Sequence, residues 1–202
     1  MNDELLAEHN RLFLQAAAMI QGEIPLHGQP DLPAPDLLQT RKLKSAITLF
    51  ERVVEMNPTN WSAMWLVGKI YQRFQNTPVA LSWFVRSFRV NPSQPDVARE
   101  VSICAMEIGR HDVAIAAAER ATQIEPNNPG LHSNLALAYL LAGRIPEAQT
   151  ASRIATEGDP SDTISQTIQS MVQHFAESGL LPPTTTPDLL IFWSHNSPRS
   201  QR

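Results

Sequence analysis

Six histidines and one cysteine are the side chains of this 202-residue chain that could bind a metal ion or act as a nucleophile. A metal site on a helix needs two ligands on one helical turn, often with a glutamate beside them. The histidines, at positions 9, 27, 111, 132, 174 and 195, show no such spacing. Cys104 has no histidine nearby in the sequence, and the glycines are scattered singly instead of forming a phosphate-binding loop. We therefore predict a protein that is not an enzyme, with no catalytic residue, no metal site and no cofactor.

The charged side chains are segregated along the chain, although the net charge is only −4. Residues 41–90 hold eight Lys and Arg against two glutamates, which gives that stretch a charge of +6. Residues 1–40 and 91–180 are both acidic. This asymmetry could orient an acidic partner, stack copies head to tail, or reflect ordinary solvated helix faces. Basic and aromatic residues do not interleave in a nucleic-acid-binding pattern, so we predict no nucleic acid partner.

The composition is that of a globular protein that folds without disulfide bonds. Hydrophobic residues make up 43% of the chain, enough for the core of one domain or one short array. Cys104 is the only cysteine, so a reducing compartment is expected. The N-terminus is acidic where a secretory signal is basic, and no apolar run approaches the roughly 20 residues of a membrane-spanning helix. We expect a cytoplasmic protein with no membrane partner.

One spacing recurs along the chain. The prolines at 58, 92, 126 and 160 follow one another at intervals of 34 residues, and each is preceded by Asn, Glu or Asp. The alanines at 46, 80, 114 and 148 keep the same interval, as do the small residues Gly68, Ser102 and Ala136. A fixed period of this length indicates stacked structural repeats.

Each repeat is predicted to be a pair of helices joined by a tight turn, because apolar residues recur at helical spacing between turn signals. Asn60 can cap a leading helix that begins at Trp61, and Gly109 and Gly143 stand where a left-handed residue ends the next two leading helices. Gly68 lies within a leading helix, where glycine costs about 1 kcal/mol relative to alanine. We interpret it as the place where the two helices of the pair touch.

Residues 64–92, MWLVGKIYQRFQNTPVALSWFVRSFRVNP, resemble the tetratricopeptide repeat. The later units depart from that family's pattern at Ala118 and Ser152, where phenylalanine is expected. The resemblance implies an all-α fold, a right-handed α-solenoid of tetratricopeptide helix pairs with about three and a half repeats and N- and C-terminal capping helices. It also implies a set of repeat-packing residues: Gly68, Tyr71, Ala80, Phe84, Pro92, Ser102, Ala114, Ala136, Tyr139 and Ala148.

The repeats set the expected domain boundaries. They should occupy 37–160, as a half repeat 37–58 and full repeats 61–92, 95–126 and 129–160, followed by a capping helix 161–179. The half repeat lacks its leading helix, since Pro30, Pro33 and Pro35 prevent a helix there. We expect the N-terminal segment 1–22 to pack on the first repeat helix or replace it, with 23–36 as a Pro-rich irregular insertion. If that helix reaches a second molecule instead, the result is a swapped dimer.

Residues 180–202 are expected to form a Pro-rich extended tail. Its apolar cluster, Leu189, Leu190, Ile191, Phe192 and Trp193, has no place in the repeat scheme. Either the cluster packs on the terminal helices of its own chain, or it is a docking motif for this protein's groove or for a neighbour.

The resemblance also implies a concave groove lined by the leading helices. Its candidate peptide contacts in this chain are Trp65, Lys69, Gln72, Arg73, Arg99, Ile103, Met106, Ser133, Asn134 and Leu137. Family members that clamp a chaperone's C-terminal carboxylate use Lys, Asn and Arg at these places, and only Asn134 matches. We therefore expect a partner segment with an apolar anchor and an acidic flank.

The predicted function is a protein–protein interaction module, an adaptor or scaffold that binds a peptide segment in this groove. Two alternatives stay open. One is a self-assembling scaffold held together by a swapped N-terminal helix or by the C-terminal tail. The other is a chaperone for a secreted bacterial protein.

Overall fold

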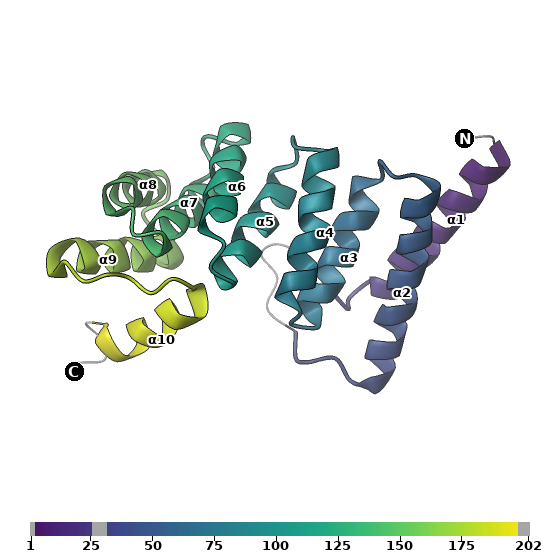
Figure 1. The fold of residues 1–202 in the computed structure, drawn as a ribbon, viewed down its shortest axis with the longest axis horizontal. Helices are drawn as coiled ribbons and strands as arrows, with labels where there is room; N and C mark the ends of the chain where they lie inside the picture. The colour runs from purple at the N-terminus through teal and green to yellow at the C-terminus, as the bar shows by residue number, and fades with distance from the viewer. Residues whose placement is uncertain (1–2, 26–31, 198–202) are drawn as a thin grey trace. The chain divides into compact units, whose positions relative to one another are not determined.

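A computed structural model describes residues 3–25 and 32–197 of the chain, most of which are helical (Figure 1). Residues 26–31 of the expected insertion and 198–202 of the expected tail lie outside the described residues. The described residues contain no strand, which confirms the all-α prediction. The helices are α1 (Asp3–Ile20), α2 (Leu37–Met56), α3 (Trp61–Arg73), α4 (Thr77–Val90), α5 (Pro95–Glu107), α6 (His111–Ile124), α7 (Pro129–Leu141), α8 (Ile145–Gly158), α9 (Thr163–Ser178) and α10 (Thr186–Asn196).

The chain divides into two compact units, which meet in the sequence between Asn91 and Pro92. In unit 1, each of the helices α1 to α4 packs against the next. In unit 2, α5 to α9 pack in the same consecutive way, and the leading helices α5, α7 and α9 also contact one another in a row. Among the helices of the described segments, none is long and apolar enough to cross a lipid bilayer.

Each trailing helix ends two residues before a repeated proline, and the residue between them is the C-cap. Asn57, Asn91, Glu125 and Asp159 are the C-caps of α2, α4, α6 and α8, and all four have extended or near-extended backbone angles. A residue that precedes proline is restricted away from helical angles, so the repeated proline sets the end of each helix. Pro92, expected among the packing residues, is instead exposed in its turn, because its role is to stop the helix rather than to fill the core.

The contact between paired helices explains Gly68. A Cβ atom added there would lie only 2.5 Å from Cε1 of Phe84. Ser102 and Ala136, the equivalent residues of α5 and α7, are fully buried at 0% exposure. In the first full repeat Gly68 faces Phe84. In the next two repeats the residue equivalent to Gly68 is larger, Ser102 or Ala136, and the residue equivalent to Phe84 is smaller, Ala118 or Ser152. Side-chain volume is therefore exchanged across the pair, and the prediction of a helix contact at this position is confirmed.

The turns inside the repeats share a left-handed residue at one position. Gly109 and Gly143 have φ values of +71° and +72°, as expected from their place after the leading helix. The equivalent residue in unit 1 is Gln75, with φ at +56°. Because left-handed angles are costly for a residue with a Cβ atom, Gln75 holds a strained conformation that the sequence pattern did not identify.

The N-terminal helix α1 packs against α2. Its residues Leu12, Ala16 and Ile20 belong to the buried cluster that also contains Phe50 of α2. The ring of Phe13 meets that of Phe50 edge to face, with centroids 5.6 Å apart. The apolar face of the half repeat is thus covered by a helix from the same chain.

The C-terminal segment differs from the expected extended tail, because residues 186–196 form α10. Thr185 caps this helix: its hydroxyl accepts from the backbone N–H of Asp188 and donates to the carboxylate of the same residue. Pro187 lies in the first turn, where a proline removes no helical hydrogen bond. The proline content predicts an extended chain, whereas the spacing of Thr185, Pro187 and Asp188 is a helix-start signal.

Candidate functional site

The leading helix of unit 1 presents a stripe of three candidate contacts, Trp65, Lys69 and Arg73, spaced four residues apart on one face of α3. Trp65 is half-buried, and its indole Nε1 is a buried donor with no acceptor in the described parts of the chain. The Nε of Arg73 donates to the backbone oxygen of Glu23 at 3.1 Å. We name these three residues the α3 stripe.

Lys69 was expected to be exposed, but only 8% of it is accessible. Gln72, one position before Arg73, is half-buried. The segment that follows α1 comes close to this end of α3, because Glu23 accepts from Arg73 and its carboxylate pairs with Lys42 Nζ at 2.9 Å. This contact over about fifty residues of sequence could not be read from helical spacing.

In unit 2, the expectation that Arg99 and Met106 are exposed is wrong. Arg99 is 7% exposed and pairs with Asp96 at 3.0 Å and with Glu100 at 3.7 Å. Met106 is 2% exposed, while Ile103 is half-buried. Because its guanidinium is already neutralised by two carboxylates of its own helix, Arg99 is a poor candidate for binding an acidic peptide.

Ser133 of α7 is likewise buried rather than exposed, because it meets the next leading helix. Its hydroxyl hydrogen-bonds that of Ser165 in α9 at 2.5 Å, and Ser165 donates in turn to the carboxylate of Asp162 at 2.5 Å. The hydrogen bond from Ser165 is the main cause that lowers the pKa of Asp162, the N-cap of α9. Asn134 and Leu137 are half-buried. This chain of hydroxyls joins two repeats and leaves Ser133 no free surface for a ligand.

Unit 2 has a cleft of about 380 Å³ between α7 and α8, lined by Leu135, Tyr139, Ala151 and Ile154 among others. The Tyr139 hydroxyl donates to Glu119 at 2.6 Å, and the guanidinium of Arg144 lies 4.6 Å from the ring centroid. Burial, followed by the hydrogen bond to Glu119, raises the pKa of Tyr139 to about 12. The hydroxyl is therefore a protonated structural donor at neutral pH and not a catalytic base.

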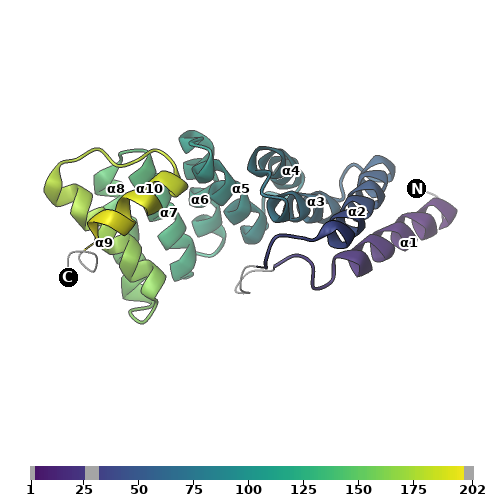
Figure 2. The ribbon, with the colours of Figure 1, turned by 90° about the horizontal axis from the view of Figure 1, so that it is seen from below.

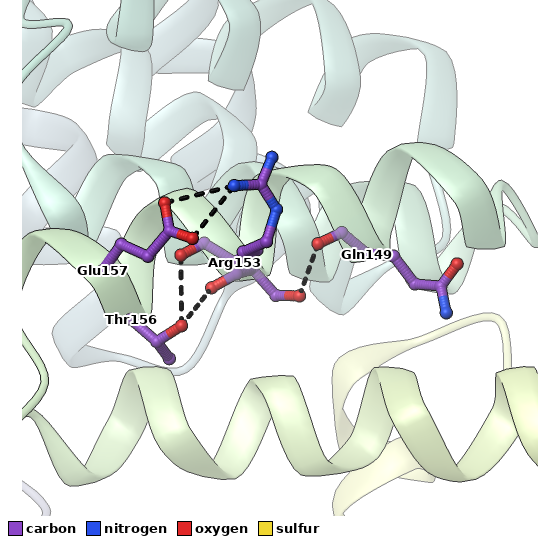
Figure 3. A network of polar contacts seen from close by, with 5 residues as sticks. Gln149, Arg153, Thr156 and Glu157 are labelled. Atoms are coloured by element: carbon purple, nitrogen blue, oxygen red, sulfur yellow. Dashed lines mark hydrogen bonds and ion pairs between the residues drawn. The ribbon is translucent and has the colours of Figure 1, made fainter.

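A second cleft, of about 300 Å³, lies between α8 and α9. Its polar residues bond mainly within α8 (Figure 3): Arg153 pairs with Glu157 at 2.9 Å, and the Ser152 hydroxyl donates to the backbone oxygen of Gln149. Both contacts are local to one helix; the ion pair is exposed, and the hydrogen bond of Ser152 is partly buried. They make a solvated helix face, with no polar group held in place for a ligand.

The apolar residues 189–193 of the tail lie on different faces of α10. Leu189 is buried at 1% exposure, whereas Leu190 and Ile191 are exposed at 57% and 61%. The rings of Phe192 and Trp193 contact His174 of α9, each with centroids 5.8 Å apart. One face of α10 therefore packs on its own chain while the other faces solvent.

The described residues bring together no group of three His, Cys, Asp or Glu side chains that could hold a metal ion. Cys104 is buried. The candidate groove residues on the leading helices that remain half-buried are Trp65, Gln72, Arg73, Ile103, Asn134 and Leu137.

Family models described as tetratricopeptide repeat match residues 34–88, 71–129 and 105–170. Together these matches span residues 34–170. Comparison with curated protein sequences gives no significant match.

Several solved structures share the fold at low sequence identity. A crystal structure of MamA is 13% identical, with a TM-score of 0.68 over 93% of this chain and 90% of that one. A fragment of MamA from Desulfovibrio magneticus RS-1 is 13% identical, with a TM-score of 0.62 over 69% and 79% of the two chains. YrrB, described as a TPR protein with an unusual peptide-binding site, is 16% identical, with a TM-score of 0.62 over 70% and 73%.

Proposed function

Since the chain belongs to the tetratricopeptide repeat family, whose members generally mediate protein–protein interaction, we propose that it is a non-enzymatic adaptor that binds a peptide segment of another protein. The single buried cysteine supports a reducing compartment, and we place the protein in the cytoplasm. YrrB supports the proposal as a solved protein of the same fold that has a peptide-binding site.

The indole N–H of Trp65, which has no acceptor among the described residues, carries the proposal. A buried N–H group without an acceptor costs stability, and native proteins retain few of them. A backbone or carboxylate oxygen of a bound peptide would satisfy Nε1, while the indole ring would contact an apolar side chain of the same peptide. Arg73, which is half-buried at the other end of the stripe, favours acidic character in the peptide residues near it.

The test compares two tryptophans of unit 1. Trp65→Phe removes the indole N–H and keeps an aromatic ring, and Trp83→Phe is the control, because Trp83 lies on α4 under Arg86 and outside the stripe. Partners recovered by the wild-type chain are identified by affinity purification and quantitative mass spectrometry. The partner is then synthesised as overlapping peptides, and binding is titrated. We expect Trp65→Phe to weaken binding about 10-fold or more, as for loss of a buried hydrogen bond, and Trp83→Phe to leave it unchanged. Equal affinities for the two variants would remove the α3 stripe as the site.

Self-association is the second candidate, favoured by the outer face of α1. Leu6 and Leu14 are 44% and 68% exposed there, whereas terminal helices of repeat arrays usually present a polar outer face. If α1 joins two copies, Leu14→Gln should lower the mass measured by light scattering at high concentration. Leu38→Gln is the matched control, since Leu38 is 74% exposed on α2. A monomeric wild-type chain would eliminate this candidate.

A further inference from the structure

The leading helices of unit 2 form a row, and α10 contacts the helices at its two ends. Helices α5 and α7 contact each other, α7 and α9 contact each other, and α10 packs against α5 at one end of the row. At the other end, the ring of Phe192 lies 5.2 Å from that of Phe175 in α9. Figures 1 and 2 both show α10 beside α9. We name the surfaces of α5 and α9 that α10 contacts the α10 seat.

The repeat places equivalent residues along this row. Met106 of α5, Leu140 of α7 and His174 of α9 are separated by 34 residues each. Met106 and Leu140 are almost fully buried, at 2% and 0% exposure. His174 contacts both aromatic residues of α10. Met106 and Leu140 belong to the buried core of the row, and His174 is the equivalent residue that packs against α10.

The chain holds α10 at this seat by few contacts. Leu189 is its one buried residue among those described, and Phe192 and Trp193 are half-buried. At the entry to the helix, His111 Nε2 hydrogen-bonds the backbone oxygen of Thr184 at 2.7 Å. An isolated helix of 11 residues is below the length that is stable in water, so α10 depends on its seat to remain helical.

The fit between α10 and its seat is incomplete. The Nε2 atom of His174, at the contact with Phe192 and Trp193, is buried without a hydrogen-bond partner in the described part of the chain. A cleft of about 490 Å³ opens beside it, lined by His174, Trp193 and polar residues of α9. A bound segment that repeats the apolar contacts of α10 and adds a polar group here would bind more tightly than α10 does.

We propose that α10 is a tethered occupant of a second peptide-binding surface, the α10 seat, and that an apolar helical segment of a partner protein displaces it. The partner carries a leucine followed three and four positions later by two aromatic residues, the spacing of Leu189, Phe192 and Trp193, and a polar group that reaches His174. This inference rests on the proposed function, because it assigns a second surface and a regulatory element to the same adaptor.

The length of the linker between α9 and α10 determines how strongly α10 competes with a free peptide for the seat. Six residues, 180–185, join the end of α9 at Gly179 to α10. A short linker gives an effective concentration of about 1 mM. A free peptide that binds the empty seat with a Kd of roughly 100 μM would therefore bind the occupied seat about 10-fold more weakly.

The experiment uses the full chain and a labelled peptide with the sequence of residues 184–197, TTTPDLLIFWSHNS. Leu189→Glu removes the buried anchor of α10, and Leu190→Glu is the matched control on the exposed face. We expect the peptide to bind Leu189→Glu at least about 10-fold more tightly than the wild type or Leu190→Glu. A peptide that carries the Leu189→Glu change should bind none of them.

Equal binding by the two variants would overturn the proposal. A wild-type dimer that only Leu189→Glu converts to a monomer would also overturn it, since α10 would then sit on a second copy. Hydrogen exchange of the wild-type chain gives an independent test if Leu189→Glu fails to fold: α10 amides must exchange faster than those of α9, and equal protection would make α10 part of the core. Because the probe is the sequence of α10 itself, failure here leaves the result at Trp65 unaffected.

Discussion

The contact between Gly68 and Phe84 predicts that adding one methyl group will destabilise unit 1. The Cβ atom of Gly68→Ala would stand 2.5 Å from Cε1 of Phe84, whereas carbon atoms in contact prefer about 3.5–4.0 Å. The ring must therefore retreat by roughly 1 Å, although Phe84 is 0% exposed and packed on all sides.

The expected change in the free energy of unfolding is a difference between two terms. Overpacking a core position costs about 1–3 kcal/mol, and alanine regains about 1 kcal/mol of helix propensity over glycine. We expect Gly68→Ala to lose about 1 kcal/mol overall. In the Phe84→Leu background the same change should cost less, with a coupling energy of about 1–2 kcal/mol.

Urea unfolding followed by tryptophan fluorescence is a suitable assay, since Trp61, Trp65 and Trp83 all lie in unit 1. A lower midpoint with an unchanged m-value reports a loss of stability. Ala136→Gly, the reverse change at the equivalent position of α7, is the matched control, measured by circular dichroism. Ala136→Gly should also destabilise the protein, by about 1 kcal/mol, because the methyl group of Ala136 already fits at the helix contact and its removal lowers helix propensity.

The reasoning would be refuted by a Gly68→Ala chain that is about 1 kcal/mol more stable than the wild type. That result would mean that helix propensity acts alone and that the ring moves aside without cost. An identical effect of Gly68→Ala in the Phe84→Leu background would also refute it, because the two residues would then not be coupled.

Three further predictions concern single side chains. Gln75→Gly should raise the free energy of unfolding by about 1 kcal/mol in urea titrations, because glycine adopts the left-handed angle of +56° without strain. Tyr139 should contribute stability below pH 10 that is lost as the pH rises towards its folded pKa of about 12, so Tyr139→Phe should flatten the alkaline decline of stability across that window. Asp162→Ala should cost about 1 kcal/mol at pH 7 through loss of the N-cap. Because the pKa of Asp162 is lowered in the folded state, that cost should disappear as the pH falls below its ordinary value of 3.8, which acid unfolding curves of the two chains would show.

The sequence alone determined the repeat and its internal contact. A period of 34 residues is a one-dimensional property, and Gly68 could be assigned to a helix contact because glycine inside a helix is costly unless two backbones approach closely. Helix ends were also predictable, since the restriction imposed by proline on the preceding residue acts locally.

Only the tertiary structure decided which surfaces remain accessible. Ser133 occupies a position that should line a groove, but it is buried against Ser165 of the next leading helix, which repeat spacing alone does not reveal. The pair of Arg99 with Asp96 lies within one helix and could have been read from its spacing of three residues. The start of α10 could have been recognised from Thr185, Pro187 and Asp188, whereas its seat could not. Contacts between side chains that are tens of residues apart depend on how the repeats pack in three dimensions. A periodic pattern specifies the packing of each helix pair, but it does not specify which later segment covers that pair.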